Sequence, residues 1–298
     1  MRAAGWFLLA IGGTLLAAAL FAWPVFQLVH TLWPDFAFHR VVTRFWQLLM
    51  LAGIALCIWR LGLRGRTDWG WGAPRARFLR EATLGLAAGI ATMLPIAAAL
   101  AALAIREWQP ALELAPLAGE IAAGALTGLA VALLEETFFR GLMYRGIERE
   151  SGATAAIAIT ALVYAAVHFL GRTQIPAEQL GWGSGLALLA GALGRFAAPL
   201  AIADAFVTLL VVGLVLGSVR RLTGSIAACI GLHMGWVWVI QSTLDLTVLD
   251  PGARQAWLVS AYDGFTGWLV AAWGALILGL LWLLRRRISP ADAPWSGS

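Results

Sequence analysis

The chain has 298 residues, of which 61% are hydrophobic and 12% are charged, and its mean hydropathy is +0.81. Soluble domains are about half apolar and about one-quarter charged, so this composition excludes a separate soluble domain. The formal charge of +5 comes from short arginine clusters between apolar runs, which argues against a nucleic-acid partner. We expect one integral membrane domain over residues 1–298, with the lipid bilayer as its surroundings.

Crossing about 30 Å of hydrocarbon takes about 20 mostly apolar residues in a helix. The sequence therefore predicts an all-α, polytopic transmembrane bundle of about eight spans. These are residues 6–29, 44–63, 82–105, 119–146, 153–170, 199–219, 225–242 and 265–284. The first run exceeds the apolar core of a signal peptide, about 7–15 residues, and is expected to be a retained span. The segment 183–196 is short and glycine-rich, which favours a re-entrant or interfacial segment.

Arginine placement predicts the orientation of the spans, because short cytoplasmic loops carry an excess of Lys and Arg. A cluster from Arg60 to Arg80 follows the second span. Further arginines follow the fourth, sixth and eighth spans: Arg145, Arg149, Arg220, Arg221 and Arg285 to Arg287. Both termini are therefore expected to be cytoplasmic. All 21 basic residues are arginine, which suggests a bacterial source and hence the bacterial cell membrane.

Five ionisable residues are embedded deep in the apolar spans: Glu135, Glu136 and Arg140 in the fourth, His168 in the fifth and His233 in the seventh. Ionisable groups at the centre of a bilayer cost at least about 2.5–3.5 kcal/mol to insert, so they indicate function.

Counting along the helices predicts that three of these side chains converge. Glu135 precedes a turn near Ser151 by 16 residues and His168 follows it by 17, so each lies about 24–26 Å from the turn. Neighbouring antiparallel helices would bring these two residues level. His233 lies about 18 Å beyond Arg221 by the same rise, and helix tilt could absorb the difference.

The two glutamates are expected to have different tasks. Glu136 and Arg140 are four residues apart and can pair on one face of the helix. Glu135 points about 100° away from Glu136 and would face the cavity. We therefore expect Glu135 to be the general base, and Glu136 and Arg140 to neutralise and position each other.

Two chemistries fit a glutamate, two histidines and a water. In the first, Glu135 deprotonates a water held by His168 while His233 stabilises the oxyanion, and no metal is required. In the second, His168, His233 and Glu135 ligate a zinc-type ion that activates its bound water. The sequence leaves both possibilities open.

At these residues the chain resembles the CPBP intramembrane proteases, the CAAX-protease and bacteriocin-processing family. The family pattern is two adjacent glutamates with an arginine four residues later, then Phe-x-x-x-His, then His-x-x-x-Asn. Matching positions are Glu135, Glu136, Arg140, Tyr164 in place of Phe, His168 and His233. The resemblance covers about residues 119–242, a catalytic core. It implies an intramembrane endopeptidase that uses these acidic, basic and histidine residues on a membrane-associated protein or peptide substrate.

One position departs from the family pattern. Val237 stands in place of the asparagine, and its side chain cannot donate a hydrogen bond to an oxyanion. Gln241 is one turn further along the same face. Val237 favours a first alternative, a catalytically silent scaffold that binds a partner in immunity or signalling. A second alternative is a proton-coupled transporter, and the plain structural alternative is a buried ion network joining helices.

Overall fold

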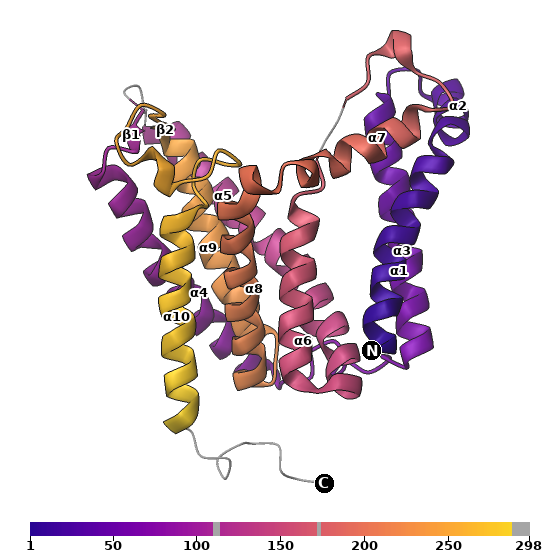
Figure 1. Cartoon of the computed structure of the whole chain (residues 1–298). Coiled ribbons are helices and arrows are strands. Elements are labelled where there is room, and N and C mark those ends of the chain that lie inside the picture. Colours follow the sequence, from indigo (N-terminus) through magenta and orange to yellow (C-terminus); the bar gives the residue numbers. More distant parts are fainter. Residues whose placement is uncertain (110–113, 172–173, 288–298) are drawn as a thin grey trace.

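The computed structural model describes residues 1–109, 114–171 and 174–287, and almost all of its regular structure is helical (Figure 1). The elements are α1 (Arg2–Leu20), α2 (Ala22–Leu32), α3 (Phe38–Leu61), α4 (Arg75–Ala102), β1 (Arg106–Trp108), α5 (Leu114–Glu136), η1 (Thr137–Met143), α6 (Tyr144–His168), η2 (Ala177–Gln179), α7 (Ser184–Leu193), η3 (Gly194–Ala197), η4 (Pro199–Ile202), α8 (Ala203–Thr223), α9 (Ala227–Leu246), β2 (Thr247–Leu249), η5 (Ala256–Leu258) and α10 (Trp268–Arg287). The long helices stand side by side as a bundle.

Six helical stretches in the described part of the chain are long and apolar enough to cross a membrane. They are Arg2–Leu20, Phe38–Leu61, Arg75–Ala102, Leu117–His168, Pro199–Thr223 and Ala227–Leu246. Two shorter apolar helices cover Ser184–Ala197 and Trp268–Leu283. The chain is thus an integral, multi-pass membrane protein. The number of eight spans and the cytoplasmic position of the termini stay predictions.

The stretch Leu117–His168 covers two of the predicted spans. Helical structure continues past residue 146, where the fourth span was expected to end, and the backbone breaks at Gly152 with φ 80° and ψ 166°. That conformation is essentially restricted to glycine. The turn between these helices therefore lies one residue from the predicted turn at Ser151.

The prediction of one continuous helix over residues 6–29 is wrong. Helix α1 ends at Leu20 and α2 begins at Ala22, with Phe21 between them at φ −96° and ψ 5°. Pro24 explains the break, because proline has no N–H and its ring clashes with the carbonyl four residues earlier, which is that of Leu20.

A short two-stranded ribbon is the one departure from the all-α class in the described residues. Strands β1 and β2 pair antiparallel, with Arg106 opposite Leu249. The buried Arg106 guanidinium donates hydrogen bonds to Oγ1 of Thr247 (2.7 Å) and to the carbonyl oxygen of Gly264 (2.9 Å). Burial lowers the pKa of Arg106, and the charge of Asp263 opposes that shift. The ribbon ties together the ends of α4 and α9.

Glycines let α4 and α9 approach closely. A Cβ atom added at Gly231 would lie 1.9 Å from the carbonyl oxygen of Ala82, and one added at Gly89 would lie 2.4 Å from the carbonyl oxygen of Leu232. Small residues four apart on both helices, including Gly85 and Gly235, produce this backbone contact. The contact fixes the position of His233, which lies between the two α9 glycines in the sequence.

Close backbone contacts at glycines also join the other helices of the core. A Cβ atom at Gly128 of α5 would lie 2.8 Å from the carbonyl oxygen of Met234 on α9. One at Gly213 of α8 would lie 2.7 Å from the Cα atom of Ala161 on α6. Helices α5, α6, α8 and α9 are therefore held at short range around one centre.

Helix α7 and η3 cover the segment predicted to be re-entrant or interfacial. Figure 1 shows α7 running across one end of the bundle, not parallel to the long helices. Ser184–Ala197 spans about 21 Å at the α-helical rise, which is too short for a full crossing. Gly185 packs against Ala19 of α1, where a Cβ atom would meet the carbonyl oxygen at 1.9 Å.

Candidate active site

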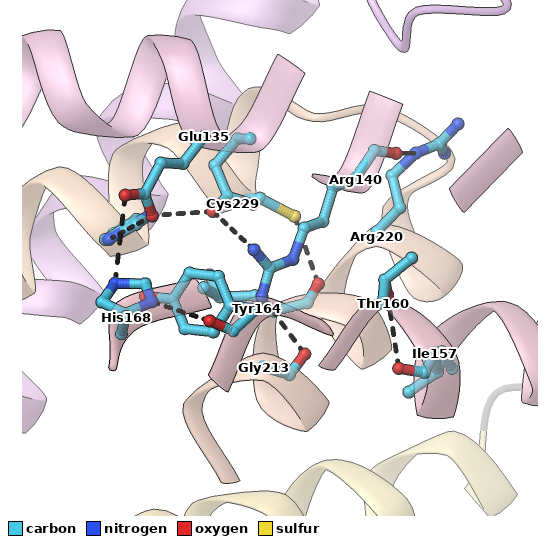
Figure 2. A network of polar contacts seen from close by, with 12 residues as sticks. Glu135, Arg140, Ile157, Thr160, Tyr164, His168, Gly213, Arg220 and Cys229 are labelled. Atoms are coloured by element: carbon cyan, nitrogen blue, oxygen red, sulfur yellow. Dashed lines mark hydrogen bonds and ion pairs between the residues drawn. The ribbon is translucent and has the colours of Figure 1, made fainter. Parts of the chain in front are cut away.

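One glutamate and two histidine side chains, from three helices, meet inside the bundle; Figure 2 labels Glu135 and His168. Glu135 lies in the last turn of α5, His168 is the last residue of α6, and His233 is on α9. Oε1 of Glu135 is 3.9 Å from Nε2 of His168, and Oε2 of Glu135 is 3.9 Å from Nε2 of His233. The predicted convergence of these side chains is present in the structure.

The fourth and fifth predicted residues form a buried ion pair beside this centre. Nη1 of Arg140 is 3.2 Å from Oε1 of Glu136, and both side chains are 0% exposed. The expected pairing is thus confirmed, but Arg140 lies within η1, a π-helix over Thr137–Met143. Widened turns of this kind are rare and frequently occur at functional sites. No pattern in the sequence predicted it.

Arg140 makes further contacts with its side chain and its backbone. Its guanidinium carbon lies 4.6 Å from the centre of the Tyr164 ring, a cation–π distance. Its Nη2 atom donates to the carbonyl oxygen of Gly213 at 3.4 Å, and its own carbonyl oxygen accepts a hydrogen bond from Nε of Arg220 at 3.0 Å (Figure 2). The ion pair and these contacts hold η1 against α6 and α8.

Hydrogen bonds on the far side of each imidazole assign the ring protons. Nδ1 of His168 is 2.7 Å from the carbonyl oxygen of Tyr164, which can only accept, so this nitrogen carries a hydrogen. Nδ1 of His233 is 2.8 Å from the carboxylate of Glu136, which the buried arginine also pairs, and donates in the same way. In the neutral form of each ring, the lone pair on Nε2 therefore faces Glu135.

The space among these atoms suits a hydrogen-bond donor. A separation of 3.9 Å is too long for a direct hydrogen bond but allows a bridging water. Oε2 of Glu135 is buried and accepts no hydrogen bond from the described residues. Because buried polar atoms are normally paired, a carboxylate oxygen and two imidazole nitrogens around one point indicate a site for water.

A zinc ion fits this arrangement less well. The donor types are those zinc prefers, but ligands at about 2.0–2.1 Å on a tetrahedron lie only about 3.3–3.4 Å apart. The distances from the Glu135 oxygens to both imidazoles exceed this value. No group of three or more His, Cys, Asp or Glu side chains within residues 1–109, 114–171 and 174–287 could hold a metal ion. The metal alternative stays an untested prediction.

Two residues that contact the site had no functional signal in the sequence. The hydroxyl of Tyr262, in the loop between β2 and α10, donates to the carbonyl oxygen of His168 at 2.8 Å. Its ring lies 4.9 Å from that of Phe169. Arg220 was interpreted only as a topology signal, but it is 6% exposed and binds the backbone of Arg140. Both contacts join segments far apart in the sequence, which local patterns cannot reveal.

Val237 occupies the position where the family has asparagine, and Gln241 follows one turn later. Val237 is one turn beyond His233 on α9 and lies beside Gly128 of α5, 3.5 Å from an added Cβ atom. The amide nitrogen of Gln241 donates to Oδ1 of Asp245 at 2.8 Å on its own helix. Gln241 therefore does not take the place of the asparagine in this conformation.

The helices and their buried polar centre define an intramembrane protein with a potential acid–base site. Residues 117–239, less than half of the chain, match the family model described as type II CAAX prenyl endopeptidase Rce1-like. This segment contains all five predicted site residues. The match supports the assignment of this segment to the CPBP/CAAX protease family. No curated protein and no solved structure matches the chain.

Proposed function

We propose that this protein is an intramembrane endopeptidase that hydrolyses a peptide bond in a membrane-associated protein or peptide. The observation that carries the proposal is the Glu135 carboxylate facing Nε2 of His168 and of His233. These groups lie inside the segment that matches the CAAX-protease family. That family match favours neither the transporter nor the silent scaffold.

In the proposed mechanism, Glu135 takes a proton from a water that also donates a hydrogen bond to Nε2 of His168. The resulting hydroxide attacks the carbonyl carbon of the substrate and forms a tetrahedral oxyanion. The C–N bond then breaks, and Glu135 returns its proton to the leaving amine. One water is consumed for each peptide bond, and no covalent enzyme intermediate forms.

His233 would stabilise the oxyanion when both of its ring nitrogens carry a hydrogen. Its Nε2–H group then points into the space beside Glu135, while its Nδ1–H group still donates to the Glu136 carboxylate. In a site with little water, a donor already in place is worth about 10²–10³ in rate. Val237 supplies no second donor.

Glu136 and Arg140 act as positioning residues in this account. Oε1 of Glu136 contacts both His233 and Arg140, so it sets the direction of the imidazole and neutralises the arginine. The backbone carbonyl of Tyr164 orients the imidazole of His168 in the same way, because it accepts a hydrogen bond from Nδ1. Hydrogen bonds behind the groups that react keep their geometry within narrow limits.

The substrate class is a second part of the proposal. The matched family is described as a CAAX prenyl endopeptidase, which favours a substrate that is associated with the membrane. A peptide delivered by a lipid anchor or a membrane helix would reach the partly exposed side chain of Glu135. If the source is bacterial, we expect the natural substrates to be membrane-associated proteins that lack a prenyl group.

Mass spectrometry of new protein termini tests the proposal. Host membranes containing the wild type or Glu135→Gln at matched levels are compared. Termini that appear with the wild type alone would support proteolysis and identify the substrates. If both membranes give identical termini while the wild type is folded, the endopeptidase proposal fails. A partner captured equally well by both proteins would then favour the scaffold.

A further inference from the structure

A cavity of about 490 Å³ lies between α6, α8 and α10, and none of the candidate active-site residues lines it. Its walls are mainly apolar and include Ile157 of α6, Leu222 of α8, and Leu278 and Leu281 of α10. Gly279 also lines it, and a Cβ atom added there would meet no atom within 4 Å. We call this cavity the α8–α10 groove. Nothing in the proposed peptidase mechanism uses it.

Two adjacent arginines at the end of α8 have opposite surroundings. Arg220 is buried and donates to the carbonyl oxygen of Arg140. Arg221 is exposed and lines the α8–α10 groove. Within the part of the chain that the structure describes, Arg221 makes no hydrogen bond or ion pair. The groove therefore combines an apolar wall with a cation that is available to a ligand.

The groove has a cation at one end and apolar walls along the rest, as a site for a lipid headgroup and an acyl chain requires. Arg221 lies in the last turn of α8, and Trp282, near the end of α10, has the indole side chain typical of the membrane interface. Leu278 lies one helical turn before Trp282 along α10, and Ile157 forms the opposite wall from α6. A phosphate at Arg221 would leave an acyl chain beside these apolar residues.

We propose that the α8–α10 groove binds one anionic phospholipid, with its phosphate on Arg221 and an acyl chain against α10. The guanidinium can donate two parallel hydrogen bonds to a phosphate, a strong and directional contact. Basic pockets between membrane helices bind anionic headgroups in this way. A zwitterionic lipid fills the apolar wall equally well but carries its own compensating cation, so Arg221 selects for net negative charge.

Lipid retention by the purified full-length protein tests the charge selection. The protein in a neutral detergent is titrated with phosphatidylglycerol or phosphatidylcholine, and bound lipid is counted by native mass spectrometry. We expect the wild type to retain phosphatidylglycerol preferentially. Arg221→Gln should weaken that binding about fivefold, the change expected for one cation near a charged surface, and leave phosphatidylcholine unchanged.

Arg80→Gln is the matched control for Arg221→Gln. Arg80 is exposed in the first turns of α4, at the end of the bundle where Arg77 donates to the carbonyl oxygen of Thr223. The Arg80→Gln substitution removes the same charge from the same end of the molecule, but Arg80 lies outside the groove. We expect Arg80→Gln to bind phosphatidylglycerol like the wild type. Equal losses in both variants would overturn the proposal and indicate general attraction to the surface.

Gly279→Leu tests the groove without altering charge. The added side chain enters open space, and leucine favours a helix more than glycine, so the protein should fold. We expect it to retain little of either lipid. Gly12→Leu on α1, where an added Cβ atom also meets nothing within 4 Å, should retain both. Unchanged retention in Gly279→Leu would overturn the proposal.

The chain's own segment 288–298, which includes Asp292, is the competing occupant. A variant that ends at Arg287 is titrated in the same way. We expect its phosphatidylglycerol retention to match that of the wild type. A marked increase would show that the segment fills the groove and would contradict the lipid assignment.

Discussion

Nδ1 of His233 lies 2.8 Å from Oε1 of Glu136, and the same oxygen lies 3.2 Å from Nη1 of Arg140. One carboxylate oxygen therefore serves an imidazole and a guanidinium in a fully buried position. Among the described residues, the adjacent Glu135 has no such partner at hydrogen-bond distance, and both imidazoles lie 3.9 Å from it. The two acidic residues should respond very differently to the same substitution.

We expect Glu136→Gln to destabilise the protein strongly. It leaves the buried charge of Arg140 without its counter-ion, and breaking a buried pair in this way costs about 3–5 kcal/mol. Glu135→Gln should change the free energy of unfolding by less than about 1 kcal/mol, because its contacts with the two imidazoles are too long for direct hydrogen bonds. Thermal unfolding in detergent measures both variants. Equal decreases in Tm would contradict the division of tasks between the glutamates.

Much of this centre could be predicted from the sequence, because charged residues in apolar spans are conspicuous and helical rise is constant. Counting from Ser151 brought Glu135 and His168 level, and the turn at Gly152 lies close to the predicted one. The ion pair of Glu136 with Arg140 followed from spacing alone. The roles of these residues stay proposals.

Other features depend on long-range contacts or on small energy differences, and sequence patterns did not reveal them. The π-helix at Thr137–Met143 has no recognisable pattern in the sequence, and the break at Phe21 was not predicted although Pro24 lies three residues later. Tyr262 reaches His168 from a loop 94 residues away. Apolarity predicts that a segment is helical but not where the helix widens or breaks. It gives no information about which loop residue contacts a distant helix.

The contact between Tyr262 and His168 can be tested by removing one hydroxyl. Tyr262→Phe keeps the ring beside Phe169 but removes the donor to the His168 carbonyl. Loss of such a hydrogen bond costs about 0.5–1.5 kcal/mol. If the contact positions His168, kcat for peptide cleavage should fall several-fold while KM stays nearly constant. An unchanged kcat with a lowered Tm would assign Tyr262 a purely structural role.

The close approach of α4 and α9 predicts the effect of a single methyl group. Gly231→Ala would place a Cβ atom 1.9 Å from the Ala82 carbonyl oxygen, so the helices must separate. Overpacking of this kind costs about 1–3 kcal/mol. Gly12→Ala adds the same methyl group to open space and should stabilise by up to about 1 kcal/mol through helix propensity. Similar Tm values for both variants would argue against direct backbone packing.

Metal dependence distinguishes the two chemistries that the sequence left open. Because the donor atoms are spaced for a water bridge, we expect cleavage to survive prolonged treatment with phenanthroline or EDTA. The measurement is the cleavage rate before and after chelation, with metal content followed by mass spectrometry. Loss of activity that zinc restores would show that the site closes around an ion, and the water mechanism would then be wrong.

The central claim is that Glu135 activates the attacking water. Comparing the cleavage kinetics of the reconstituted wild type and Glu135→Gln tests it most directly. Wild type and Glu135→Gln are placed in liposomes with a peptide substrate, and kcat and Tm are measured for each. We predict that kcat falls by about 10²–10⁴ while Tm changes little, as expected for loss of a general base. A folded Glu135→Gln variant that cleaves at the wild-type rate would contradict the account.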